Sequence, residues 1–342
     1  MSAPGSTRTG SEHAGGRRAF IACLGGLLAA PAIGLAQAPP RIPRIGYLSI
    51  GSASDPRRAA LFDAFRQGLH DLGYIENQNI RIEARFAEGA YERVPKLAAE
   101  LVRLAPDAIV AYSTPAASAA RDATREIPIV MSAVVDPVAT GLVAALGHPG
   151  GNVTGLSLMA PEIVGKQMQL LTEVIPKLTR VAVLWNPSNP SNPPQLHEAE
   201  LAAHTLRVQL YPLEARDRQA LDGAFLAMTR ERVGALVILV DGTLADNRVA
   251  IAHLADKGHV PTVYGLREHV EAGGFMFYGA SPVESNRRAA VFVDKILRGA
   301  RPADLPVEQP TKFDLTINRR IAKSLGLVIP PSILVRADEI FE

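Results

Sequence analysis

Short apolar runs alternate with amphipathic segments along the chain from Arg44 onward, each apolar run ending in a polar turn. Runs such as 236–240 are apolar throughout, which is typical of parallel strands covered on both faces. Strands that alternate with helices predict βαβ units and an α/β fold. The expected strands are 44–50, 80–86, 108–112, 127–133, 180–185, 208–211, 235–240 and 260–264. The expected helices lie at 56–72, 91–104, 114 onward, 162–175, up to 206, 218–230, 246–257 and 284–298, with one more after Asp136-Pro137.

A glycine turn divides this series near its middle. Residues 148–158 contain Gly150-Gly151 followed by a short extended run, and 273–279 repeat that character. A proline-punctuated connector leads into a third such run at 309–317. We interpret the three runs as crossover hinge strands between two Rossmann-like lobes with parallel sheets. The expected lobes are 39–154 plus 280–309, and 155–279 plus 310–342. In the first run, Asn152 and Thr154 are expected to support the hinge.

Charge and composition fit a globular protein. Apolar residues make up 47% of 342 residues and charged residues 20%. The formal charge of +2 comes from residues 1–38, which hold three arginines and one glutamate, so the remainder is neutral. A neutral chain without a basic stripe argues against a nucleic-acid partner.

Residues 1–38 have the pattern of a signal peptide. Arg17-Arg18 precede the apolar run 19–35, and the small residues 36–38 fit a cleavage site. The arginine pair resembles a twin-arginine signal, and Sec export is the alternative. Most of the apolar run follows Cys23, which disfavours a lipoprotein. We therefore expect a periplasmic protein. Cys23 is the only cysteine, so cleavage leaves no thiol and no disulfide.

Candidate ligand-binding residues follow from a rule for open parallel sheets, in which ligands lie beyond the carboxyl ends of the strands. Small polar residues there precede helices, whose free N–H groups suit an anion. Each can equally be a helix cap or turn former. The first lobe supplies Ser49, Gly51, Ser52, Tyr112, Ser113, Thr114 and Asp136. The second supplies Trp185, Asn186, Ser188, Asn189, Asp241, Thr243 and Tyr264, with Tyr278 on a crossover.

Two kinds of side chain in this set suggest a ligand class. The aromatic residues at strand ends can stack on a flat ligand, or pack in a core or hinge. Asp241 is the carboxylate that directly follows the strand 235–240, so it can pair with an ammonium group. Asp136 can do the same, although its place before Pro137 also fits a helix cap.

Catalytic and cofactor motifs are missing from the sequence. The histidines show no zinc-type spacing, and there is no nucleophile elbow, phosphate loop or dinucleotide glycine motif. We therefore expect no enzyme activity, no metal and no cofactor. A Ser/His/Asp site assembled by the fold is the remaining alternative, which would make the cleft that of a hydrolase or lyase.

The order of several segments resembles the TrpX-like family of ABC transporter substrate-binding proteins, which are type I periplasmic binding proteins. The resemblance rests on His148-Pro149-Gly150-Gly151-Asn152-Val153-Thr154-Gly155 and on residues 17–21, 65–69, 72–74, 87–89, 136–138, 271–274, 303–313 and 336–339. It covers essentially the whole chain after the leader. No single segment is unique to the family, but their order and spacing are specific.

The resemblance implies an exported, monomeric receptor that closes on a small organic solute and delivers it to a permease and ATPase. It also implies an amino acid as ligand, since characterised relatives are associated with tryptophan or tyrosine. In that setting Asp241 would meet the ligand amine and Ser113-Thr114 its carboxylate. The alternative from another class is an exported sensor that presents its closed form to a signalling partner.

Overall fold

The first lobe is built on a five-stranded parallel sheet. The computed structural model describes Met1 and residues 41–342, so the predicted signal segment with Cys23 lies outside the described residues. The sheet has the order β2-β1-β3-β4-β5. Its elements are β1 (Arg44–Ser49), α1 (Pro56–Asp71), β2 (Arg81–Phe86), η1 (Tyr91–Arg93), α2 (Val94–Arg103), β3 (Ala108–Tyr112), α3 (Thr114–Ala123), β4 (Ile129–Val134) and β5 (Val153–Ser157). Helix α10 (Pro282–Leu297) returns to this lobe and packs beside α1.

The second lobe is built on a seven-stranded sheet with the order β12-β11-β10-β9-β8-β6-β7. All of its pairs are parallel except β10 with β11. Its elements are α4 (Ala160–Val174), β6 (Arg180–Trp185), α5 (Asn192–Leu206), β7 (Gln209–Glu214), α6 (Arg218–Arg230), β8 (Ala235–Ile238), α7 (Gly242–Asp246), α8 (Arg248–Lys257), β9 (Thr262–Tyr264), α9 (Glu268–Glu271), β10 (Met276–Gly279), β11 (Asp314–Asn318), α11 (Arg319–Ser324), α12 (Pro331–Leu334) and β12 (Glu339–Phe341). A 3-10 turn, η2 (Pro302–Asp304), follows α10.

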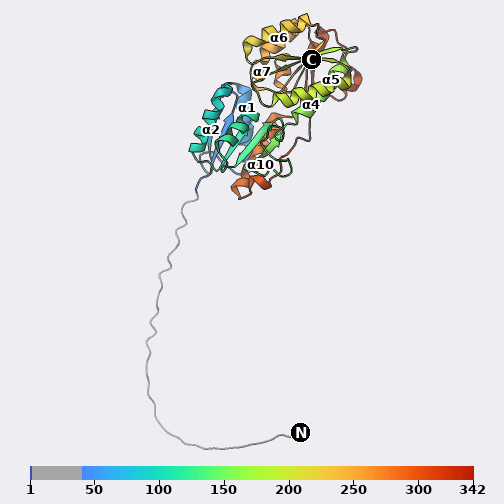
Figure 1. The fold of residues 1–342 in the computed structure, drawn as a ribbon. Coiled ribbons are helices and arrows are strands. Elements are labelled where there is room, and N and C mark those ends of the chain that lie inside the picture. Colours follow the sequence, from blue (N-terminus) through green and yellow to red (C-terminus); the bar gives the residue numbers. More distant parts are fainter. Residues whose placement is uncertain (2–40) are drawn as a thin grey trace, which may run out of the picture. The chain divides into compact units, whose positions relative to one another are not determined.

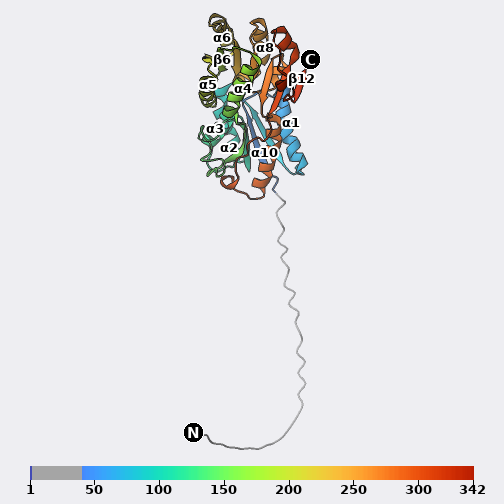
Figure 2. The same cartoon turned by 90° about the vertical axis from the view of Figure 1, so that its right-hand side faces the viewer.

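Helices cover both faces of each sheet, which explains the uninterrupted apolar strands (Figures 1 and 2). In the first lobe, α1 and α10 pack on one face, and α2 and α3 pack on the other. In the second lobe, α4 and α5 pack on one face, and α6 and α8 pack on the other. The predicted α/β fold with two lobes is confirmed.

The chain passes between the lobes in three segments: 158–159, 280–281 and 309–313. These segments are shorter than the predicted hinge strands, because β5 pairs within the first sheet and β10 and β11 pair within the second. The connector before β11 also lies along β5, where Glu308 N–H donates to the Gly155 carbonyl over 2.9 Å. The side chain of Asn152 bonds the carbonyls of Thr124 and Ile127, and that of Thr154 bonds the carbonyl of Leu305.

The prediction of a helix after Asp136-Pro137 is wrong, since residues 137–147 form turns. Asp136 does act as a cap, but its carboxylate accepts from the N–H groups of Val138 and Ala139 within one turn. Between the strand and helix expected at 235–240 and 246–257, the structure adds the short helix α7. Among the described residues no helix is both long and apolar enough to cross a bilayer.

Candidate functional site

A cavity lies between the lobes at the carboxyl ends of both sheets. Both lobes contribute apolar and polar side chains to its wall. The first lobe provides Ile50, Arg58, Tyr91, Tyr112, Ser113, Thr114 and Val135, the crossing segment provides Leu158, and the second lobe provides Asn189, Ser191, Val240, Asp241 and Leu266. A largely apolar wall with a few polar groups is the usual make-up of a small-molecule site.

Asp241 is the polar centre of the second-lobe wall. It caps α7, and its Oδ1 accepts from the Leu244 N–H over 2.8 Å. Its Oδ2 accepts from Asn189 Nδ2 at 2.9 Å and from Asn186 Nδ2 at 3.3 Å. Tyr91 of the first lobe donates its hydroxyl to the same oxygen over 2.6 Å. The buried carboxylate is thus held in one orientation from its own lobe and is also contacted across the cleft.

The asparagines around Asp241 are fixed by their own backbone bonds. Asn192 Oδ1 accepts from the Asn186 N–H over 2.7 Å, and Asn189 Oδ1 accepts from the Ser191 N–H over 3.0 Å. The loop 186–193, in which Asn-Pro occurs three times, is therefore held rigid at the end of β6, with the amide groups of Asn186 and Asn189 aimed at Asp241. Thr243 lies behind the carboxylate and accepts from Asn186 Nδ2 over 3.4 Å.

Ser113 faces the cavity from the first lobe with a strained backbone. Its φ of 86° falls in the left-handed region that a serine rarely adopts, at a cost of order 1–3 kcal/mol. Its Oγ is buried, and no described residue bonds it. It occupies the N-cap position of α3 but makes no side-chain capping bond, and the first-turn N–H groups of Thr114 and Ala116 have no acceptor one turn back. Strain and an unpaired buried hydroxyl at one position make Ser113 a candidate ligand contact.

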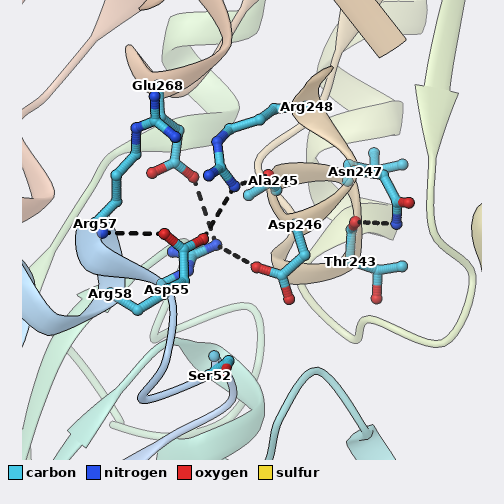
Figure 3. A network of polar contacts seen from close by, with 12 residues as sticks. Ser52, Asp55, Arg57, Arg58, Thr243, Ala245, Asp246, Asn247, Arg248 and Glu268 are labelled. Carbon is cyan, nitrogen blue, oxygen red and sulfur yellow. Dashed lines mark hydrogen bonds and ion pairs between the residues drawn. The ribbon is translucent and has the colours of Figure 1, made fainter. Parts of the chain in front are cut away.

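Arg58 closes one side of the cavity. It lies in the first turn of α1, and its side chain covers Gly51, where an added Cβ would lie 2.8 Å from Arg58 Cδ. Its Nη1 is 3.4 Å from the Tyr112 hydroxyl, and its Nη2 is 3.4 Å from both Asp246 Oδ1 and Glu268 Oε1 of the second lobe (Figure 3). Burial raises the pKa of Tyr112 to about 12, so this phenol stays neutral at ordinary pH.

The structure brings five of the predicted site residues to the cavity wall: Tyr112, Ser113, Thr114, Asn189 and Asp241. Asn186 and Thr243 lie directly behind Asp241. Thr114 also has a structural role, since its Oγ1 accepts from the Val135 N–H over 3.2 Å.

The other predicted residues lie outside the wall of the interlobe cavity. Ser49 accepts from the Gly51 N–H, Ser52 bonds Ser54, and Ser188 N–H donates to Asn186, as turn residues do. Tyr264 is buried and stacks on His269, Tyr278 stacks on Phe313, and Trp185 packs against the second-lobe core. Gly51 lies under Arg58, and Asp136 caps its turn.

Arg58 and Tyr91 were absent from the predicted set. Both obey the strand-end rule, since Arg58 follows β1 and Tyr91 follows β2 within one loop. Applying the rule to the first helical turn as well as to the loop would have found them. Within residues 41–342, no group of three or more His, Cys, Asp or Glu side chains is placed to hold a metal ion.

Comparison with known proteins decides the family. Residues 51–341 match the family described as ABC transporter substrate binding protein. The chain belongs to this family. Its members bind solutes and work with ABC transporter components, and the two-lobed fold with an interlobe cavity agrees with that role.

Three relatives of the ABC transporter substrate binding protein family are informative. The tyrosine-binding protein of Clostridioides difficile (strain R20291) is 26% identical over 263 residues, which are 77% of this chain and 75% of the relative. The ABC domain in complex with L-Trp from Streptococcus pneumonia is 27% identical, with a TM-score of 0.82 over 87% of this chain and 99% of that one. The ligand-free, open structure of a substrate binding protein with adhesive properties from Clostridium difficile is 25% identical, with a TM-score of 0.66 over 88% and 99%.

Proposed function

We propose that this protein binds a free amino acid with an aromatic or other apolar side chain in the interlobe cavity. The observation that carries the proposal is the pairing of Asp241 on one wall with the unbonded Ser113 hydroxyl and the α3 N-terminus on the other. One wall suits a cation and the opposite wall suits an anion, as a zwitterion requires. The tyrosine-binding and tryptophan-bound relatives support the aromatic class.

In the proposed complex, the ligand ammonium pairs with the Asp241 carboxylate, near the Tyr91 hydroxyl and Asn189. The ligand carboxylate accepts from Ser113 Oγ and from the first-turn N–H groups of α3. The ligand side chain packs on Ile50, Leu158 and Leu266, with the Tyr112 ring beside it. Each lobe therefore holds one charge of the ligand, so both charges are satisfied only when the lobes close.

The closed arrangement of the lobes supports this mechanism. The structure superposes better on the L-Trp complex than on the ligand-free, open relative, although both comparisons cover nearly the same share of the chain. The cross-cleft bond from Tyr91 to Asp241 also needs the lobes to be together.

We further propose that the protein is exported to the periplasm as a monomer and hands its ligand to a permease and ATPase. The twin-arginine-like segment at 17–21 and the family membership support this placement. A pull-down of the tagged protein from membranes separates the roles, since recovery of a permease supports import and recovery of a sensor kinase supports signalling.

Isothermal titration against a panel of amino acids tests the ligand class. We expect saturable binding of L-Trp, L-Tyr or L-Phe at micromolar or lower Kd, with a melting temperature that rises with ligand concentration. Tryptamine and tyramine lack the carboxylate, and the 3-arylpropionates lack the amine. Each analogue should bind about 100-fold more weakly or worse, since each leaves one buried charged or polar wall unpaired. Equal binding of either analogue, or no saturable binding of any amino acid, would overturn the proposal.

A further inference from the structure

Charged side chains at the start of α1 face charged side chains of the second lobe, just beyond the cavity (Figure 3). Asp55, the N-cap of α1, receives Arg248 Nη1 at 3.0 Å. Arg58 reaches Asp246 and Glu268 at 3.4 Å each. Arg58 thus reaches from the first lobe to acids of the second, and Arg248 reaches from the second lobe to an acid of the first. Both sets of ion pairs cross the cleft. Asp55 also accepts from the Arg57 N–H, and Arg248 also donates to the Ala245 carbonyl, each within its own lobe.

Burial distinguishes this cluster from an ordinary surface ion pair. The side chains of Arg58 and Arg248 are 4% and 12% exposed, and those of Asp55 and Glu268 are 16% and 15% exposed. The neighbouring pair Arg57 and Glu271, at 36% exposure each, is in water and contributes little. Removing one partner would leave a buried, uncompensated charge in the closed form. Opening the lobes would return that charge to water, so the loss of a partner favours the open form.

We propose that Asp55, Arg58, Asp246, Arg248 and Glu268 form a latch that holds the lobes closed, with Arg58 as the positioning residue that connects the latch to the ligand cavity. One consequence rests on the proposed function: the affinity for the amino acid should depend on residues that do not touch it.

Arg58 provides the connection because it lines the cavity while its guanidinium contacts the second-lobe acids. A ligand that fills the cavity packs against the same side chain that the latch fixes. The pair Asp55–Arg248 lies outside the cavity lining, so its effect on binding can act only through closure.

Asp55→Asn and Arg248→Gln, singly and together, test the latch. Asparagine keeps the N-cap bond to the Arg57 N–H and removes only the charge. Dyes on Lys96→Cys and Leu226→Cys, which are exposed on α2 and α6, report the lobe separation by energy transfer without any ligand. We expect each single variant to open the ligand-free protein and to weaken amino-acid binding about 10-fold. The double variant should be no worse than the worse single one, since the two act as a pair.

The matched control is the pair Glu173 and Arg336, which are 2.9 Å apart and both belong to the second lobe. Glu173→Gln with Arg336→Gln should change neither the dye distance nor the affinity. Additive effects of the Asp55 and Arg248 variants, or an unchanged dye distance in both, would overturn the latch. Because the dye distance needs no ligand, a failed search for a ligand affects only the proposed function.

Discussion

Asp241→Asn should weaken amino-acid binding about 100-fold or more while the protein stays folded. The substitution keeps the shape and the α7 cap but removes the charge that the ligand ammonium needs. It also puts an NH2 group where Oδ2 accepts from Asn186, Asn189 and Tyr91. Loss of one partner of a buried, hydrogen-bonded charge pair costs about 2–5 kcal/mol, and each 1.4 kcal/mol is roughly tenfold in Kd. Isothermal titration gives the affinity, and circular dichroism with a melting curve reports the fold.

Asp136→Asn is the matched control. Both aspartates lie within three residues of a strand end, and each caps the turn or helix that follows, but only Asp241 lines the cavity. Asparagine accepts the same N–H bonds from Val138 and Ala139, so affinity and melting temperature should stay as they are in the parent protein. If the Kd of Asp241→Asn stayed within about threefold of the parent value, the ligand ammonium would not bind at Asp241.

The tryptamine and tyramine titrations sharpen this comparison. Ligands that lack the carboxylate still present the ammonium, so they should lose further affinity in Asp241→Asn. The 3-arylpropionates lack the ammonium, so Asp241→Asn should leave their weak binding unchanged or improve it. The contrast between the two series assigns the ligand amine to Asp241 independently of any general loosening of the cleft.

Much of the fold followed from local patterns. The strands at 108–112 and 180–185 and the helix at 218–230 agree with the structure residue for residue, because each is a buried apolar run or a periodic segment between clear stop signals. The helix expected after Asp136-Pro137 failed because the same Asp-Pro signal opens a turn as readily as a helix. No periodic apolar face follows it to stabilise a longer segment.

The site was predicted unevenly for a physical reason. Asp241, Ser113 and Asn189 were found because their backbone positions at strand ends fix where their side chains lie. Tyr264 meets the same rule, yet its ring turns into the core and stacks on His269. Side-chain direction depends on packing between elements distant in sequence. The burial of Arg58 depends likewise on a second-lobe acid, Asp246, that lies 188 residues away, which no local pattern contains.

Gly155→Ala should destabilise the first lobe by about 3 kcal/mol or more, the largest stability effect expected at a single methyl group. Gly155 lies in β5 with φ at 131°, where an L side chain is strained. An added Cβ would lie 2.1 Å from the Met131 carbonyl oxygen and 2.7 Å from the Met131 nitrogen. Both are backbone atoms of the adjacent strand, so no side-chain rotation relieves the overlap. Strain and overpacking of this kind cost about 1–3 kcal/mol each.

Urea unfolding followed by circular dichroism measures the effect, and Gly151→Ala is its control. Gly151 lies four residues earlier with open space where a Cβ would go, so its alanine variant should unfold within about 0.5 kcal/mol of the parent. Because Gly155 also holds Glu308 through its carbonyl, a displaced β5 would shift two of the three crossing segments. We therefore expect Gly155→Ala to alter the ligand-free dye distance as well as stability. If Gly155→Ala unfolded at the same urea concentration as Gly151→Ala, the close approach of β5 to Met131 would be disproved.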